Sequence, residues 1–359
     1  MKTAKKNQHY IPKFYLRNFS FEVNQKEIGV FNITNQIFIQ RAKLKTQGSK
    51  KFFYGEDGKI EDSLSIIEGK LAATIKNIIQ SEELPQKLSS EHFELMTFLT
   101  LTDFRNPVRI QSMTGMFDTM KMRLNELDPN FDTSKVLPEH THEETVKQSL
   151  SFTRKIIEII ADLDYKLLIN NTTTPFLTSD FPIIKYNQFL EQRKWPNSKS
   201  GYGVTGLQIF VPITSKYVIL FFDSDIYKVG FKKRQTLELN NSKEIDEINV
   251  LNFINCFDTI FFNHEVNEHY VKALFTKSKK FKRANVSQAE LSYLIENHND
   301  YNPMKNNGYK NLMIMRSTDC ETKLNISGIK MHSKGKVNKL HSSMAQLRPH
   351  AEKIRKYRR

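Results

Sequence analysis

The stretch from Ser89 to Phe104 constrains the fold most, because its apolar side chains surround a helical wheel instead of forming one stripe. Such a helix is stable only with neighbours on every side, so we expect it at the centre of a helical layer. Ser89 or Ser90 is a suitable N-cap. Pro107 should kink or end the helix near Arg105–Asn106.

The flanking patterns predict helices first and a sheet second. An apolar face recurs at helical spacing over residues 60–80, and a third helix is expected over 142–163. From residue 163 the pattern changes to period two with β-branched residues, which favours strands. We therefore predict an α+β fold: an N-terminal aromatic block and a helical layer packed on a mostly antiparallel sheet. We predict one domain over residues 1–270 and a basic extension over residues 271–359. The predicted strands cover 27–32, 36–40, 165–170, 175–178, 207–213, 217–223 and 259–263, with further helices over 242–257 and from about 265.

Composition narrows the class of protein. The chain has 359 residues, of which 39% are hydrophobic, so it can bury a sizeable core. Two cysteines cannot form a disulfide framework, and free thiols suit a reducing compartment. The longest apolar run, Tyr217–Phe222, is too short to cross a membrane, and the first residues lack a signal-peptide pattern. We expect a soluble cytoplasmic protein without a membrane partner.

The positive charge is concentrated near the C-terminus. Residues 271–359 hold 20 Lys and Arg against 6 Asp and Glu, whereas the first 270 residues hold 34 against 33. Nucleic acid is the expected partner of such a segment; the alternative is a solubilising or disordered tail. Two compact runs with an interleaved aromatic suit phosphate contact and base stacking, although charge alone does not distinguish RNA from DNA. Their basic residues are Lys277, Lys279, Lys280, Lys282 and Arg283, then Lys353, Arg355, Lys356, Arg358 and Arg359.

An aromatic-rich block over residues 8–19 stands where a chain end is usually polar. Burying it would carry His9 and Arg17 into an apolar setting, where polar groups need partners. His9 could transfer protons or bind metal or phosphate, and Arg17 could contact an anion, including nucleic acid. The structural alternative is a packing plug with a hydrogen-bonded histidine.

Glu61 and Glu68 project from the apolar face of the first predicted helix. They lie two turns apart, about 10 Å along the axis, which is too far for one metal ion without other groups. A carboxylate on a buried flank needs a cation, a hydroxyl or a metal. The alternative is a salt bridge to an arginine of the neighbouring helix.

Arg105 and Arg109 straddle Pro107 at the end of the buried helix. Paired arginines at a helix break could hold a phosphate. Arg105 could equally pair with Glu61 or Glu68, which would join two candidates into one polar network.

Asp180 follows a predicted strand and two hydroxyl residues, Thr178 and Ser179. An aspartate in this position can bind a metal ion, act as a base, or form an Asx turn.

Two literal motifs fail in their context. Residues 201–206 match G-x-G-x-x-G but precede a strand instead of opening a helix, so we predict a loop. His264 and His269 are five residues apart, one more than a zinc-binding H-E-x-x-H helix requires.

The N-terminal block resembles the signature H-x-x-P-x-x-Y-L-R-x-F, which opens the bacterial family DUF 4238, a domain of unknown function. Further elements follow in the family's order over about residues 8–270: Phe53-Tyr54, the carboxylate-bearing helix, Arg105-Asn106-Pro107, Thr178–Pro182 and a turn over 212–215. The signature residues matched are His9, Pro12, Tyr15, Leu16, Arg17 and Phe19.

Some members of that family look like stand-alone defence proteins against phage, so the resemblance implies an effector that damages or blocks nucleic acid. From residue chemistry we expect a metal-assisted nuclease, either an RNase or a DNase. His9 would be the general acid or base and Arg105 would steady the phosphate. Glu61, Glu68 and Asp180 would orient water or hold Mg²⁺ or Mn²⁺, with Glu68 and Asp180 as metal ligands. The alternatives are a non-catalytic protein that binds nucleic acid or senses a phage component, and a protein-binding body with an incidental tail.

Overall fold

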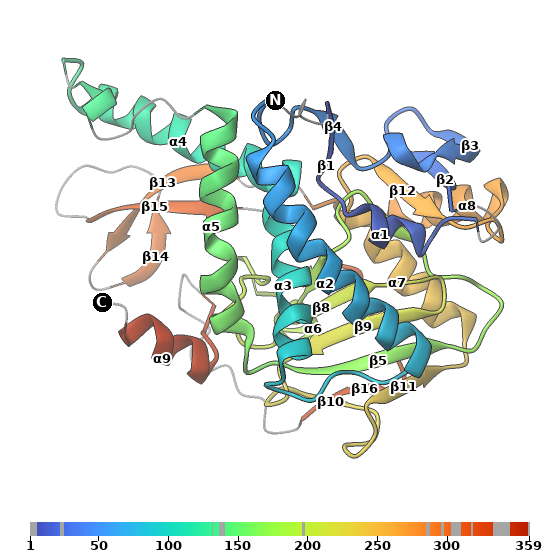
Figure 1. Ribbon diagram of the computed structural model, residues 1–359. Helices are drawn as coiled ribbons and strands as arrows, with labels where there is room; N and C mark the ends of the chain where they lie inside the picture. The colour runs from blue at the N-terminus through green and yellow to red at the C-terminus, as the bar shows by residue number, and fades with distance from the viewer. Residues whose placement is uncertain are drawn as a thin grey trace.

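A five-stranded sheet with the strand order β11-β5-β9-β8-β7 runs through the centre of the computed structural model (Figure 1). The structure describes residues 6–21, 25–130, 132–135, 141–195, 198–284, 288–295, 298–302, 310–316, 319–332 and 345–357. Neighbouring strands of this sheet are antiparallel except for the β11–β5 pair, which confirms the predicted mostly antiparallel sheet. The strands are β5 (Asp164–Asn170), β7 (Ile184–Tyr186), β8 (Gln208–Pro212), β9 (Tyr217–Phe222) and β11 (Thr236–Leu239).

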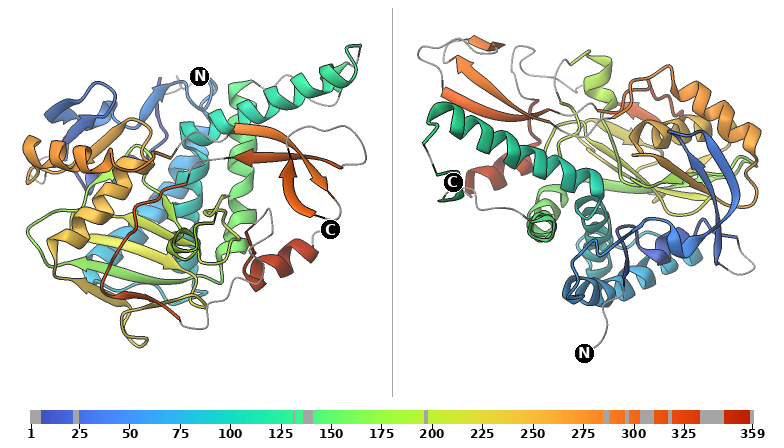
Figure 2. Two further views of the ribbon diagram at one scale, coloured as in Figure 1. Left: turned by 180° about the vertical axis from the view of Figure 1, so that it is seen from behind. Right: turned by 90° about the horizontal axis from the view of Figure 1, so that it is seen from above.

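The central strands bury both of their faces. Ile219 and Phe221 of β9 belong to one hydrophobic cluster, whereas Val218 and Leu220 belong to another. Successive side chains of a strand point to opposite faces, so a continuous apolar run requires cover on both sides. Helices α2 (Lys59–Ser81), α3 (Ser90–Phe104) and α5 (His142–Ile160) cover one face of the sheet. Helix α7 (Ser242–Asn255) covers the other face (Figures 1 and 2).

The helical layer contains α2 (Lys59–Ser81), α3 (Ser90–Phe104) and α5 (His142–Ile160). Met96, Phe98 and Leu99 of α3 are completely buried, as expected for a helix that is apolar on all sides. Ser89 is its N-cap, since its hydroxyl accepts a hydrogen bond from the His92 N–H at 3.2 Å.

Pro107 ends one helix and starts another. The new helix, α4 (Pro107–Leu127), is not predicted by the sequence analysis. Asn106 caps it, because its Oδ1 accepts from the Val108 N–H at 3.0 Å, and proline suits the first helical position because its missing N–H would have no intrahelical partner.

The N-terminal block docks into the layer between these helices and a second, four-stranded sheet with the order β3-β2-β12-β6. Ile11, Tyr15, Leu16 and Phe19 are completely buried. The Tyr15 hydroxyl donates to the Pro212 carbonyl at 2.6 Å and lies 2.6 Å from Thr178 Oγ1. The elements are β1 (Asn7–His9), α1 (Lys13–Arg17), β2 (Glu27–Asn32), β3 (Ile37–Lys43), η1 (Leu44–Thr46), β4 (Ser49–Lys51), β6 (Thr178–Ser179) and β12 (Thr259–Phe262).

Described parts of the predicted basic extension pack against the body. Residue 270, the expected boundary, lies inside α8 (Glu268–Ser278), whose Val271 and Leu274 are buried. Strand β16 (Ile329–Met331) pairs with β10 (Tyr227–Val229). Arg348, which is 1% exposed, donates to both carboxylate oxygens of Asp162 at 2.8 and 3.0 Å.

The remaining elements complete the chain. Residues 201–206 form turns before β8, so this stretch is a loop as predicted. No helix in the described part of the chain combines the length and apolarity that a membrane crossing requires. These elements are η2 (Thr133–Lys135), α6 (Gln188–Gln192), β13 (Gln288–Ile295), β14 (His298–Asn302), β15 (Lys310–Arg316) and α9 (Pro349–Tyr357).

Removing the buried hydroxyl of Tyr15 tests how the block is held. Tyr15→Phe leaves the Pro212 carbonyl without this donor, so we expect a loss of about 1–3 kcal/mol in the free energy of unfolding. Urea denaturation measures this loss. Tyr357→Phe is the control, because Tyr357 is 81% exposed, and it should match the parent. Equal stability of Tyr15→Phe and the parent would contradict this account of the block.

Candidate functional site

A cavity of about 310 Å³ lies between the N-terminal block and α2. Four of the residues singled out from the sequence line it: His9 and Arg17 from the block, and Glu61 and Glu68 from the helix. Lys13, which the sequence analysis did not select, lines it as well. A histidine, two carboxylates and two cations thus share one hollow, although the two segments lie about fifty residues apart.

Backbone pairing and one glutamine hold His9 in place. Strand β1 pairs with β4, which sets His9 opposite Ser49. The side chain of Gln8 accepts from the Tyr54 N–H at 2.5 Å and donates to the Gly55 carbonyl at 2.9 Å. The Tyr54 hydroxyl donates to the His9 carbonyl at 3.0 Å. The His9 side chain is therefore carried by a fixed strand, and only 7% of the residue is exposed.

One face of α2 supplies the opposite wall. Glu61 and Glu68 are seven residues apart and so lie on the same side of the helix. Small residues on that side, Ser65, Gly69 and Ala72, also line the cavity. A Cβ added to Gly69 would meet no atom within 4 Å. These small side chains leave the space between the carboxylates open. Glycine is unfavourable inside a helix, so Gly69 within α2 is the sequence signal of this opening.

Arg105 orients one of the two carboxylates. Its side chain is 1% exposed, and its Nη1 donates to Glu68 Oε1 at 2.6 Å. Burial disfavours the charged guanidinium, but Tyr54 and Glu68 outweigh that effect and raise the pKa of Arg105. Arg105 does not line the cavity. It therefore holds the Glu68 carboxylate from the protein interior and does not contact a phosphate in the cavity.

Asp180 lies outside this cavity and has a different set of partners. One carboxylate oxygen accepts from the Phe257 N–H at 2.8 Å. The other accepts from the N–H groups of Asp258 and Thr259 at 2.8 and 2.9 Å. Burial raises the pKa of Asp180 to about 6, against the opposing effect of these three donors. Its carboxylate holds together the chain between α7 and β12.

The predicted metal ligands do not fit a common ion. Glu68 lies at the cavity and pairs with Arg105, whereas the oxygens of Asp180 accept three backbone N–H groups. Within the residues described, no group of three or more His, Cys, Asp or Glu side chains is arranged to hold a metal ion. Glu68 and Asp180 therefore do not form a common site for Mg²⁺ or Mn²⁺.

Arg109 belongs to a second polar cluster. Its Nε donates to both carboxylate oxygens of Asp103, at 3.1 and 3.0 Å, and the Tyr202 hydroxyl donates to Asp103 at 2.6 Å. Lys185 lies over the Tyr202 ring, and burial lowers the pKa of Lys185 to about 8. The two arginines around Pro107 thus serve separate networks and do not share one anion.

The C-terminal basic residues that the structure describes do not line the cavity. Arg283 donates to the carbonyls of Cys256 and Phe257 at 2.6 and 2.7 Å, so it is engaged inside the fold. Lys277 is on α8, and Lys279, Lys280 and Lys282 follow along the chain. Helix α9 carries Lys353, Arg355 and Lys356, whereas Arg358 and Arg359 lie outside the described residues. None of those that are described lines the cavity.

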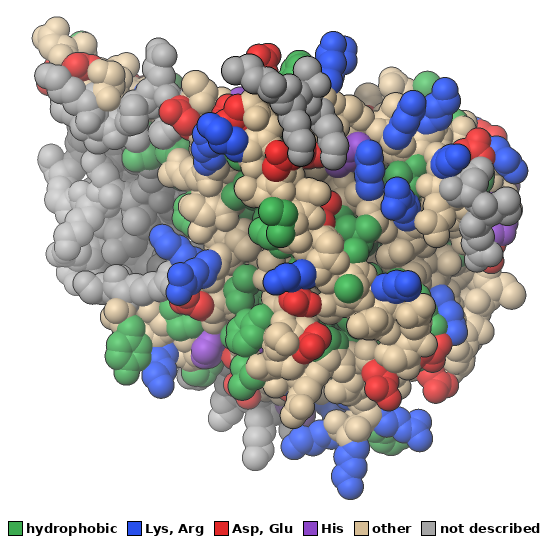
Figure 3. All heavy atoms as spheres, viewed as in Figure 1, with side chains coloured by type: hydrophobic (Ala, Val, Ile, Leu, Met, Phe, Trp, Pro, Cys, Tyr) green, Lys and Arg blue, Asp and Glu red, His purple; other side chains and the backbone are tan. Residues whose placement is uncertain are grey.

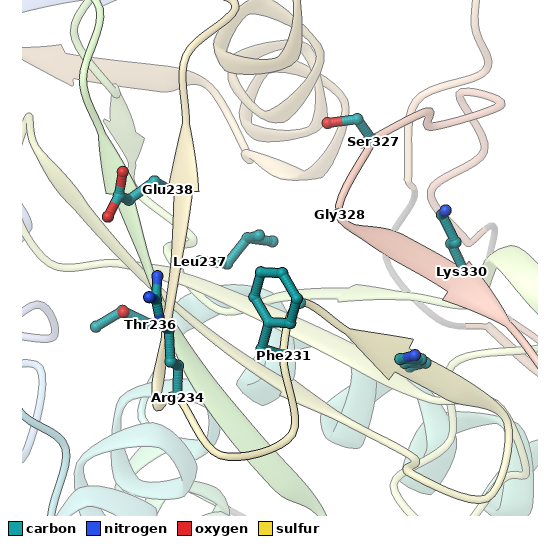
Figure 4. A pocket seen from close by; sticks show the side chains of 10 residues that line it. Phe231, Arg234, Thr236, Leu237, Glu238, Ser327, Gly328 and Lys330 are labelled. Atoms are coloured by element: carbon teal, nitrogen blue, oxygen red, sulfur yellow. The ribbon is translucent and has the colours of Figure 1, made fainter.

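A separate hollow of about 410 Å³ opens beside β11 (Figure 4). Phe231 and Leu237 lie on one side of it, and Ser327, Gly328 and Lys330 lie across the gap. It contains none of the residues singled out from the sequence.

The family described as "Protein of unknown function (DUF4238)" matches residues 7–265. The chain belongs to this family. No curated protein and no solved structure matches it. The match covers the cavity residues of the DUF4238 domain together with α2, α3 and the central sheet. It ends before α8 and the C-terminal segments.

Neutralising Glu68 in the DUF4238 domain should leave the buried guanidinium of Arg105 without its charged partner. We expect Glu68→Gln to lower the free energy of unfolding by about 1–3 kcal/mol, less than for a fully buried pair because Glu68 is 25% exposed. Thermal or urea unfolding measures the change.

The matched control is Glu268→Gln. Glu268 pairs with Lys272 at the same 2.6 Å, but both side chains are 53% exposed. That loss should stay below about 0.5 kcal/mol. Equal losses in the two variants would show that the burial of Arg105 has no effect on stability.

Proposed function

We propose that this DUF4238 protein hydrolyses phosphodiester bonds of nucleic acid, RNA or DNA, at the cavity between the N-terminal block and α2. One observation carries the proposal: His9, Glu61 and Glu68 line one cavity together with the cations Lys13 and Arg17. An acid–base pair beside positive charge is one combination that catalyses phosphate-ester hydrolysis.

The residues take complementary roles in this proposal. Glu61 orients and deprotonates a water molecule, which attacks the phosphorus atom. The bond from phosphorus to the leaving oxygen breaks, and His9 donates a proton to that oxygen. Lys13 and Arg17 stabilise the negative charge that builds up on the phosphate oxygens. Asp180 takes no part, because its carboxylate already accepts three backbone N–H groups.

Glu68 and Arg105 set the geometry. The guanidinium of Arg105 fixes the position of the Glu68 carboxylate, and the carboxylate in turn faces the cavity. Arg105 is therefore a positioning residue in the proposed mechanism, since it reaches the substrate only through Glu68.

The proposed setting is defence against phage in the cytoplasm. This part of the proposal draws on the family resemblance, since some members look like stand-alone defence proteins. In that setting, a component of the phage would activate the protein.

Removing the acid or the base should slow cleavage strongly. We expect His9→Ala and Glu61→Gln to lower the rate on labelled RNA or DNA by about 10²–10⁴-fold, measured with Mg²⁺ and Mn²⁺ present. The controls are His269→Ala and Asp62→Asn, which change exposed residues outside the cavity and should cut like the parent.

Two results would contradict the proposal. One is a parent protein that cuts neither RNA nor DNA, which would leave a binding protein without catalysis. The other is undiminished cleavage by both cavity variants.

Filling the cavity tests its role separately from charge. Leucine at Gly69 would project into open space, and leucine favours a helix more than glycine does. We expect Gly69→Leu to unfold no more easily than the parent but to lose cleavage.

Gly115→Leu on α4 is the matched control, because a Cβ there also meets no atom within 4 Å. It should retain activity. Full activity in Gly69→Leu would show that the substrate does not enter this cavity.

A further inference from the structure

A basic hollow of about 410 Å³ adjoins the candidate site. Two of its cations, Lys13 and Arg17, also line the cavity that holds His9 and Glu68, so the two hollows share a wall. We call the hollow the basic groove and define it by its five exposed cations, Lys13, Arg17, Lys26, Lys43 and Lys45.

The fold presents these cations from three segments. Lys13 and Arg17 are four residues apart on α1, so they lie on one face of that helix, opposite the buried Tyr15 and Leu16. Lys26 immediately precedes β2, and Lys43 ends β3. Lys45 belongs to η1, the turn that follows β3.

Backbone hydrogen bonds hold the walls together. The Leu44 N–H donates to the Lys26 carbonyl at 2.8 Å, which brings the start of β2 beside the end of β3. Asn7 Nδ2 donates to the Lys45 carbonyl at 2.8 Å, and Asn7 itself lines the candidate site. The groove and the site are therefore parts of one frame.

The charge of the groove is strongly one-sided. Among the described residues that line the groove, Glu27 supplies the carboxylate, and Glu27 lies 3.3 Å from the guanidinium of Arg41. Figure 3 shows Lys and Arg side chains gathered over the region that Figure 1 labels α1, β2 and β3. Like charges that line one hollow raise the local potential and attract a polyanion.

We infer that the basic groove binds the sugar–phosphate backbone of a nucleic-acid strand and leads that strand into the candidate site. The second half of this statement rests on the proposed function, and the first half does not. A row of cations that ends at a histidine and two carboxylates would place successive phosphates along the groove and one phosphate at the site.

The groove is better placed to contact a strand at the candidate site than the C-terminal basic residues that the structure describes. Helix α9 lies far from α1 in every view of the molecule (Figures 1 and 2). Arg348 and Arg283 form hydrogen bonds inside the fold. Within the described residues, the cations that line the candidate site are Lys13 and Arg17 of the N-terminal block.

Charge reversal in the groove tests the inference by binding alone. The double variant Lys43→Glu/Lys45→Glu changes exposed side chains that lie outside the catalytic cavity. Fluorescence anisotropy with a short labelled single strand, as RNA and as DNA, measures affinity over a range of salt concentrations. We expect a loss of about tenfold or more, and a slope of log affinity against log salt that is shallower by about 1.4, because two phosphate contacts are lost.

The control variant, Lys232→Glu/Lys233→Glu, makes the same change of charge on an exposed loop outside the groove. It should bind like the parent. If the groove variant does not fold, Lys43→Gln/Lys45→Gln replaces it, and its slope should be shallower by the same amount. Affinity that differs between RNA and DNA in the parent, and is lost for both in the groove variant, also supports the inference.

Unchanged affinity and slope in the groove variant would overturn the inference, and so would an equal loss in the control. A different result would contradict the proposed function: a parent protein that binds nucleic acid but does not cut it. Binding that depends on Lys43 and Lys45 without cleavage would therefore keep the groove and remove the nuclease.

Discussion

The hydroxyl of Tyr15 joins three parts of the chain that are far apart in sequence. From the N-terminal block it reaches Thr178 of β6 and the carbonyl of Pro212 at the end of β8. The surrounding side chains of the block are completely buried against α3 and the central sheet. Because β1 belongs to the same segment, this docking also decides where His9 stands. The candidate site thus depends on packing at a distance from it.

Electrostatics then fix the geometry of the candidate site. A fully buried arginine needs an anionic partner, and Glu68 supplies it from the wall of the cavity. This pair fixes the position of one carboxylate. Glu61 lies two turns away on the same face of α2 and lines the same cavity. Two exposed cations of α1 face both this opening and the basic groove. Substrate binding and catalysis would share Lys13 and Arg17 in this arrangement.

Much of the helical layer and of the site could be predicted because each depends on local pattern. Helical periodicity places Glu61 and Glu68 on one face, and the apolar character of residues 8–19 requires their burial. The pairing of Arg105 with a glutamate of the neighbouring helix, left open as one of two alternatives, is present as Arg105–Glu68. The predicted central position of α3 is confirmed, because Met96, Phe98 and Leu99 on different sides of the helix are all completely buried.

The rest depends on contacts that no local pattern contains. The partners of Asp180 are backbone groups of residues 257–259, so its neighbours could not be read from Thr178 and Ser179. In the sequence, each lysine of the basic groove resembles an ordinary surface residue. Only the folded chain brings the three segments that carry these lysines together. A count of charges over residues 271–359 also does not show where each charge lies in the structure. Arg283 and Arg348 form hydrogen bonds inside the fold.

A structure of the Glu61→Gln variant with a bound oligonucleotide would test the central claim most directly. We predict one phosphate between His9 and α2, with the strand continuing past Lys43 and Lys45. A strand bound along α9, or in the hollow beside Phe231, with the cavity of His9 left empty, would contradict the account.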